Sequence, residues 1–386
     1  MKPLIFRTNW REAARISSVV TGGTKLNRVL MFLHISLAPA PQWCCLFEDG
    51  YTRNLFRGSF FPRGAHRKST AMPSPYDTNA FTLSPASPQA AAISQLFVGT
   101  LIFLAAILVL VTVLIIFAVV RYRDRPGAPE PIQSFGSRNL EIIWTAVPIL
   151  CLVVLTVCVA WTMHASDPPA PDQSPDLRIV GHQWWWEIDY LKSGAVAANE
   201  IHIPIGRRML IELRSADVIH DFWVPQLARK MDIIPGHPNR MWLEANTPGV
   251  YLGACAEFCG NEHAWMRFQV IAQPADQYDA WLRDQLTIPS KLNSADAQRG
   301  GQLFGDRTCA NCHTVMGTPA KERIGPDLTH IASRRMLAAG AAENTPENLA
   351  IWLHDPNRFK PGSNMPNLQL STDDVRDLVA YLETLK

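Results

Sequence analysis

Two long, uncharged apolar runs constrain this chain more than any other feature of its sequence. Leu96–Val120 contains 25 residues and Ile142–Met163 contains 22, and neither run holds a charged side chain. A helix needs about 20 such residues to cross the hydrocarbon core of a bilayer. A buried helix of a soluble domain is the alternative, but two such runs in one chain are rare there. We therefore predict a transmembrane hairpin over residues 86–168, with helices at about 96–120 and 142–163.

The charges that flank these runs predict the orientation of the hairpin. The connector 121–139 carries four arginines, whereas residues 164–176 contain neither lysine nor arginine. Because basic residues are concentrated in cytoplasmic loops, the connector is expected on the cytoplasmic side. Everything after Met163 is then expected on the outer, periplasmic side. The formal net charge is only +2 and no later segment is strongly basic, which argues against a nucleic-acid partner.

Residues 1–85 are expected to form an N-terminal extension with two alternative explanations. The segment starts with basic residues and continues with the weakly apolar stretch VLMFLHISLAPA, which has the shape of a short signal sequence. The alternative is that the natural start lies downstream, for example at Met72. The sequence leaves both open.

Short runs rich in β-forming residues follow the hairpin. They alternate with turns that contain glycine and proline, and they are LRIVGHQWWWEIDY, EIHIPI, RMLIELRS, IHDFWV, RMWLEAN, GVYLGAC and RFQVIAQ. Strands at this spacing are typical of an antiparallel β sandwich, here predicted for residues 170–286. Within the first run, Trp184, Trp185 and Trp186 cannot all face inward if they lie on one strand, because side chains alternate between its two faces.

The pattern becomes helical after Pro274, and residues 295–386 are predicted to form a small all-α domain. Its motif CANCH, from Cys309 to His313, is the attachment signature of a c-type haem. Cys309 and Cys312 would bind the haem covalently, and His313 would ligate the iron. The carbonyl of Pro326 is expected to accept a hydrogen bond from the His313 ring.

Met365, in the segment PGSNMPNL, is the expected ligand on the opposite side of the haem iron. A methionine ligand raises the haem potential and suits electron transfer. The alternative for Met365 is an ordinary loop methionine. The alternative for Cys309 and Cys312 is a zinc-binding pair.

A second concentration of metal-ligand residues lies in GACAEFCGNEHAWM, from Gly253 to Met266. It contains Cys255, Cys259 and His263, and His220 precedes it by 35 residues. Two thiolates and two imidazoles suit a tetrahedral zinc, and the two cysteines could instead form a disulfide. Neither alternative accounts for Met266. Thiolate, imidazole and thioether together are typical of copper sites for electron transfer, and two thiolates can bridge two copper ions.

The chain resembles subunit II of the haem-copper cytochrome c oxidases, in the caa3-type variant with a fused cytochrome c domain. The resemblance covers about residues 85–386 and rests on the hairpin and on GHQWWWEIDY, HDFWVPQL, MDIIPG, CAEFCGNEHAWM and CANCH. It implies a cupredoxin-like Greek-key sandwich. It also implies that the binuclear copper centre, CuA, is held by the side chains of His220, Cys255, Cys259, His263 and Met266 and by the Glu257 carbonyl.

The resemblance gives expected roles to three further side chains. It implies that the Glu257 carboxylate helps to bind magnesium at the contact with subunit I. It also implies that electrons reach the copper pair at Trp184, where simple core packing is the alternative. Glu141 would lie near the start of a proton path in subunit I. The alternative is that Glu141 is simply a negative charge at the start of a helix, where such charges are favourable.

The resemblance further implies a multi-pass protein of the bacterial inner membrane. Electrons from cytochrome c or another periplasmic donor would pass through haem c and CuA to subunit I. That subunit carries haem a, haem a3 and CuB, reduces oxygen to water and pumps protons, and subunit III is a further expected partner. The two predicted helices contain no histidine of their own that could hold these groups. Two alternatives are a subunit of a nitric oxide reductase and an exported, zinc-binding haem c carrier without a catalytic partner.

Overall fold

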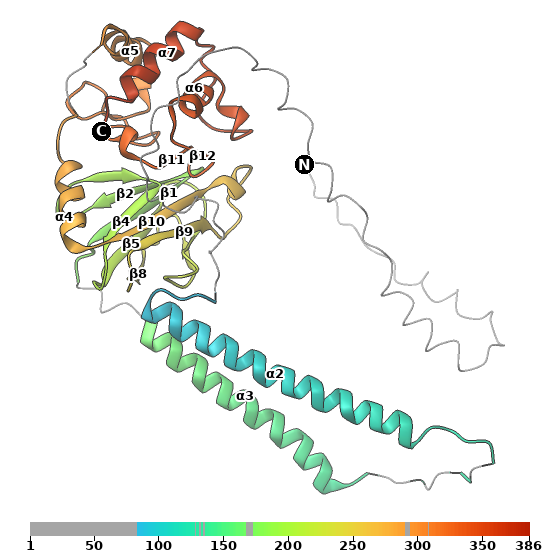
Figure 1. Cartoon of the computed structure of the whole chain (residues 1–386). Coiled ribbons are helices and arrows are strands. Elements are labelled where there is room, and N and C mark those ends of the chain that lie inside the picture. The colour runs from blue at the N-terminus through green and yellow to red at the C-terminus, as the bar shows by residue number, and fades with distance from the viewer. Residues whose placement is uncertain are drawn as a thin grey trace, which may run out of the picture. The chain divides into compact units, whose positions relative to one another are not determined.

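A computed structural model describes residues 83–127, 129–130, 133, 136–166, 173–289, 294–307 and 309–386 of the chain (Figure 1). Residues 1–82 of the expected N-terminal extension lie outside the described residues.

Helices α2 (Pro88–Arg121) and α3 (Arg138–Ser166) form the predicted hairpin and run side by side in Figure 1. Both extend beyond the apolar runs that predicted them. The side chain of Ser87 accepts a hydrogen bond from the backbone N–H of Ala90, and Pro88 follows in the first turn, so α2 begins with a strong cap. Apolar side chains on both helices face outward, and Leu108 is 67% exposed. Such continuous apolar surface belongs in lipid or against another membrane protein.

Ten strands form two five-stranded sheets, which make up the expected sandwich. The first sheet contains, in spatial order, β3 (Val196–Ala198), β2 (Trp185–Tyr190), β1 (Leu177–His182), β5 (Met209–Ser215) and β8 (Asn239–Leu243). The second contains β4 (Glu200–Pro204), β10 (Arg267–Gln273), β9 (Gly249–Cys255), β6 (His220–Trp223) and β7 (Met231–Ile233).

Two strand pairs depart from the expected antiparallel arrangement. β1 pairs with β5 in parallel, and β10 pairs with β4 in parallel. The chain leaves the first sheet after β3, adds β4 to the second sheet and returns for β5. This crossing places strands that run in the same direction side by side. The alternation of apolar residues alone does not indicate such parallel pairs.

The run that contains the three tryptophans is a hairpin and not one strand. β1 and β2 pair antiparallel, with His182 opposite Trp185, so Gln183 and Trp184 form the turn between them. Trp186 is fully buried in the sandwich core, whereas Trp184 is partly exposed at the turn. The rings of Trp186, Phe222 and Phe268 contact one another beneath the metal-ligand residues described below.

Helix α4 (Ala275–Asp284) closes the sandwich, and its Tyr278 and Trp281 pack against the core. The Trp281 ring stacks on the partly buried ring of His202, with 3.9 Å between their centroids.

The C-terminal domain contains α5 (Ala295–Asp306), α6 (Pro346–His354), α7 (Thr372–Leu382) and the short strands β11 (Met336–Leu337) and β12 (Ala342–Glu343). Helices α5 and α7 cross closely at Gly300, where an added Cβ would lie 2.0 Å from the backbone oxygen of Asp377. This domain has an apolar core of its own, which includes Phe304, Leu378 and Tyr381.

Candidate metal centre

The sandwich brings the predicted ligands of the second cluster together from separate segments. His220 begins β6, Cys255 ends β9, Cys259 lies in the following loop, and His263 starts a short 3-10 helix, His263–Trp265. Met266 immediately precedes β10. The pairing of β6 with β9 places Phe222 opposite Cys255, which brings the start of β6 to the thiol loop.

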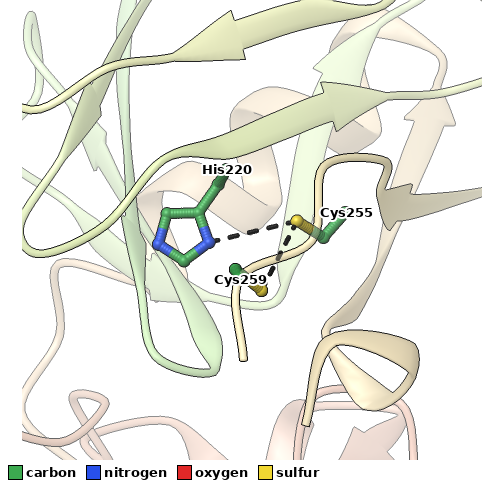
Figure 2. Close-up of side chains that lie close together, drawn as sticks. All are labelled: His220, Cys255 and Cys259. Carbon is green, nitrogen blue, oxygen red and sulfur yellow. Dashed lines mark hydrogen bonds between the residues drawn. The ribbon is translucent and has the colours of Figure 1, made fainter. Parts of the chain in front are cut away.

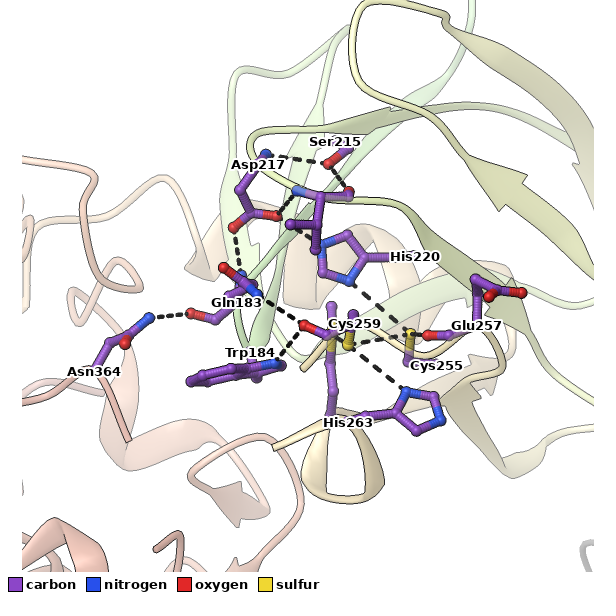
Figure 3. Close-up of polar contacts among 12 residues, drawn as sticks. Gln183, Trp184, Ser215, Asp217, His220, Cys255, Glu257, Cys259, His263 and Asn364 are labelled. Atoms are coloured by element: carbon purple, nitrogen blue, oxygen red, sulfur yellow. Dashed lines mark hydrogen bonds and ion pairs between the residues drawn. The ribbon is translucent and has the colours of Figure 1, made fainter. Parts of the chain in front are cut away.

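The ligand atoms form two halves that meet at the sulfur atoms. Figure 2 shows His220 with the two cysteines, and Figure 3 adds His263 and Glu257. In one half, the Cys255 Sγ lies 3.9 Å from the His220 Nδ1 and 3.2 Å from the carbonyl oxygen of Glu257. In the other, the Cys259 Sγ lies 3.6 Å from the His263 Nδ1 and 3.8 Å from the Met266 Sδ. The two Sγ atoms are 3.8 Å apart. Each half therefore offers one imidazole and one weaker ligand to a shared pair of sulfurs.

These distances bear on the two alternatives. A disulfide needs about 2.05 Å between its sulfurs, so Cys255 and Cys259 are not bonded to each other in this structure. For a single zinc, all four ligand atoms would lie about 2.0–2.3 Å from one ion. However, the group whose ligand atoms all lie within 4.8 Å of one another contains His220, Cys255 and Cys259 but not His263.

A carboxylate fixes the ring of His220. The His220 Nε2 lies 2.8 Å from the Asp217 Oδ1, which leaves the His220 Nδ1 directed at the Cys255 sulfur. Such a partner sets the tautomer and orientation of a ligating histidine. Gly181 lies against the same ring, since an added Cβ would come within 2.8 Å of the His220 Cδ2.

The environment of Cys255 favours its thiolate. The contact with the Cys259 sulfur, and then that with His220, lower the pKa of Cys255. Thiolate is the form that binds metal, so Cys255 is suited to ligate a soft metal ion.

The other predicted site residues of the sandwich and the hairpin lie in different surroundings. Glu257 directs its carbonyl toward Cys255, while the residue as a whole is exposed (Figure 3). The Trp184 Nε1 donates a hydrogen bond of 3.0 Å to the carbonyl oxygen of Cys259. Glu141 lies exposed in the first turn of α3. The site geometry brings Trp184 next to a ligand residue, and it assigns no role to Glu141.

The haem-binding motif also folds as its residues suggest. Cys309 begins a 3-10 helix, Cys309–Asn311, and Cys312 and His313 follow it directly. The His313 Nδ1 donates a hydrogen bond of 2.8 Å to the carbonyl of Pro326, as predicted, which leaves its Nε2 for iron. Burial lowers the pKa of His313 and so favours the neutral ring that binds metal. Met365 packs against the core of this domain. This donor set fits a c-type haem.

Two residues near the copper site escaped the sequence analysis. Asp217 contacts His220, and the Gln183 side chain donates a hydrogen bond of 2.8 Å to the Cys259 carbonyl. The segment DVIH places an aspartate three residues before the histidine, which could have indicated Asp217. Gln183 had no local signal, because Cys259 lies 76 residues away.

Three family models match successive parts of this chain. They are cytochrome c oxidase subunit II, transmembrane domain, at residues 75–159; cytochrome c oxidase subunit II, periplasmic domain, at 195–273; and cytochrome c, at 297–386.

Curated relatives agree with these matches. Cytochrome c oxidase subunit 2 of Alkalihalophilus pseudofirmus is 38% identical over 317 residues, which cover 80% of this chain and 92% of the relative. The protein of the same name from Bacillus sp. (strain PS3) is 34% identical, with 69% and 80% covered. Quinol oxidase subunit 2 of Bacillus cereus is 29% identical, with 57% and 77% covered.

Proposed function

The chain belongs to the cytochrome c oxidase subunit II family, and we propose that it receives electrons for the oxidase from a periplasmic cytochrome c donor. It is a membrane protein with a fused cytochrome c domain and a subunit of a haem-copper oxidase, whose catalytic subunit I is therefore its partner. In our proposal, electrons pass through haem c and then through CuA to subunit I, which reduces oxygen to water and pumps protons.

One observation carries this proposal, namely the division of the copper site into two halves around two sulfurs. Cys255 is accompanied by His220 and the Glu257 carbonyl, and Cys259 by His263 and Met266. Two thiolates that each have their own imidazole suit two copper ions that share both sulfurs. The Glu257 carbonyl and the Met266 thioether would serve as the weak ligands of one ion each.

The protein's task at this site is to hold ligands still while single electrons pass. The bound copper pair and the haem supply one-electron redox chemistry, and no bond to oxygen is made in this chain. His220 is buried and held by Asp217, and Cys255 ends a strand of the sheet. Ligands that are fixed in both redox states need little rearrangement, which favours fast electron transfer.

We extend the proposal to the remaining predicted residues. Trp184 would receive electrons that a donor delivers directly to the copper domain, because its indole already contacts the Cys259 carbonyl. The exposed Glu257 carboxylate would help to bind magnesium against subunit I. Glu141 would lie near a proton path on the cytoplasmic side, with both C-terminal domains on the periplasmic side and subunit III as a further partner.

Three alternatives would require different metals or partners. A quinol-oxidising subunit, the function named for the Bacillus cereus relative, would not need the six groups that we propose as copper ligands. A nitric oxide reductase subunit could use the same copper centre, so its partner subunit would distinguish it. A zinc-binding haem c carrier would lack both copper and a catalytic partner.

Metal and haem analysis of the purified complex tests the proposal. We expect about two copper ions for each haem c, together with the near-infrared absorption and multi-line electron spin resonance of a mixed-valence pair, and co-purification of a subunit that carries haem a. One zinc and no copper would overturn the proposal. Copper with a nitric-oxide-reducing partner would support the nitric oxide reductase alternative.

A further inference from the structure

The loop that contains Met365 contacts the turn between β1 and β2. The Lys360 Nζ donates a hydrogen bond of 2.9 Å to the carbonyl of Trp184. The Asn364 Nδ2 donates one of 2.9 Å to the carbonyl of Gln183 (Figure 3). Asn364 is covalently adjacent to Met365, the proposed iron ligand. The haem domain thus contacts the turn through Asn364, the residue next to its proposed iron ligand.

The other side of the same turn contacts the copper site. The Gln183 Nε2 and the Trp184 Nε1 both donate to the carbonyl oxygen of Cys259, at 2.8 and 3.0 Å. Gly260 makes this approach possible. It has a φ of +116°, and an added Cβ would lie 3.0 Å from the Trp184 ring and 3.1 Å from the Gln183 Nε2.

Hydrogen bonds from backbone N–H groups fix the register of the two domains elsewhere in their interface. The buried carboxylate of Glu200 accepts hydrogen bonds from the backbone N–H groups of Arg335 and Met336, at 2.6 and 3.1 Å. The N–H of Arg267 donates to the Ala339 carbonyl at 3.1 Å. The Glu200 carboxylate is buried and paired with two neighbouring amides, and the third contact joins backbone to backbone, so these contacts restrict sliding between the domains.

Side chains add charge pairing and apolar contact to that interface. The guanidinium of Arg323 lies 2.9 Å from the Glu187 carboxylate. Trp185, Ala198 and Ala339 form a small buried apolar cluster across the two domains. Lys360 is only 4% exposed, although it is charged, so its contact with the Trp184 carbonyl is made away from solvent.

We propose that Asn364 and Gln183 form the bridge by which an electron passes from the haem domain to the copper site of the same chain. The bridge rests on the function proposed above. It runs from Met365 through the adjacent Asn364, across one hydrogen bond to Gln183, and across a second to Cys259. Tunnelling through covalent and hydrogen bonds decays less steeply with distance than tunnelling across an unbonded gap, so a bonded route is favoured.

The transfer balances without any other reactant. One electron leaves the ferrous haem iron, which becomes ferric, and the copper pair is reduced by that electron. No proton or leaving group moves. Asn364 and Gln183 act as positioning residues, since they bind neither metal themselves, and Lys360 holds the turn against the haem domain.

The test measures electron transfer within the full chain in its purified oxidase complex. A photoreductant injects one electron into the haem, and the haem and copper absorbances are followed separately. We expect Asn364→Ala to slow haem-to-copper transfer several-fold, because it replaces one hydrogen bond of the route with an unbonded gap. Asn367→Ala is the matched control, because the Asn367 side chain bonds Asp355 within the haem domain and should leave the rate unchanged.

A second variant cuts the bridge on its copper side. Gln183→Leu removes the bond from Nε2 to Cys259 but keeps the Gln183 backbone carbonyl that Asn364 contacts. We expect it to slow transfer to a similar extent. The double variant should be no slower than the slower single variant, because one route cannot be interrupted twice.

Hydrogen–deuterium exchange at the amides of Arg267 and Met336 distinguishes loss of the electron route from loss of contact between the two domains. These amides should stay protected in both variants, and redox titration should show an unchanged haem potential. Rates within twofold of the unaltered chain would overturn the proposal, as would slowing that occurs only together with lost protection. Absence of haem-to-copper transfer in the unaltered chain would instead overturn the proposed function itself.

Discussion

Asp217 offers a measurable test of how the protein prepares the copper site. Its Oδ1 lies 2.8 Å from the His220 Nε2, and its Oδ2 accepts a hydrogen bond of 2.6 Å from the backbone N–H of Gln183. Asp217→Asn keeps the shape of the side chain but removes its charge. One of its two acceptor atoms also becomes a donor, so the amide cannot serve both partners.

The expected magnitude follows from those contacts. A hydrogen bond to a charged group contributes about 1.5–3 kcal/mol and a neutral one about 0.5–1.5 kcal/mol, so the loss of charge costs about 1–1.5 kcal/mol. That difference corresponds to an affinity for copper that is about tenfold lower. It agrees with the lower part of the 10–100-fold range that is typical when a partner of a ligating histidine is removed.

The assay is a competition titration of copper between the protein and a chelator of known affinity, followed by the copper-pair absorbance. Asp279→Asn is the control, because it makes the same chemical change on the exposed face of α4. We expect the control to match the unaltered protein. An affinity for Asp217→Asn within twofold of the unaltered protein would refute the idea that Asp217 orients His220.

Three further changes test the haem domain. Met365→Ala should leave the haem attached but lower its potential, since a methionine ligand raises it; an unchanged redox titration would exclude Met365 as the ligand. Gly300→Ala would place a Cβ 2.0 Å from the Asp377 oxygen, so we expect a loss of about 1–3 kcal/mol of stability, visible as a lower unfolding temperature in the haem absorbance. The hydrogen bond from Arg299 lowers the pKa of Asp377 in the folded protein. The Asp377 carboxylate therefore stabilises the fold above its unfolded pKa of about 4, and this contribution is lost as the pH falls through the lowered value. Asp377→Asn should lower the unfolding temperature at neutral pH, and the difference should shrink in acid; a difference independent of pH would contradict this.

The sequence predicted those features whose information is local. The apolar runs, the CANCH motif and the spacing of Cys255, Cys259 and His263 each lie within one segment, and the structure folds each segment as expected. The contact of His313 with the Pro326 carbonyl was predicted because only 13 residues separate them. Helices α4 and α7 likewise follow from local periodicity.

Features that depend on distant partners could not be predicted in the same way. Trp184, Trp185 and Trp186 favour strands equally, so nothing in their side chains indicates that the turn falls at Trp184. The parallel pairing of β1 with β5 depends on where β4 joins the other sheet. Glu200 resembles any charged residue at a strand end, and its burial results from the haem domain, whose contacting amides lie 135 and 136 residues away.

The segment that precedes α2 is hydrogen-bonded to the sandwich at several points. The Ala86 N–H donates to the carbonyl of Gln226 and the Ala86 carbonyl accepts from Asn246, both at 2.8 Å, while the Ser87 hydroxyl donates to the Leu227 carbonyl at 2.5 Å. These residues are separated from β1 in the sequence by both membrane helices. A water-soluble fragment of the copper domain that starts at β1 would therefore expose three backbone groups that are paired in the intact protein. Joining residues 83–87 to such a fragment through a short linker should restore those pairings and give a more stable protein for spectroscopy.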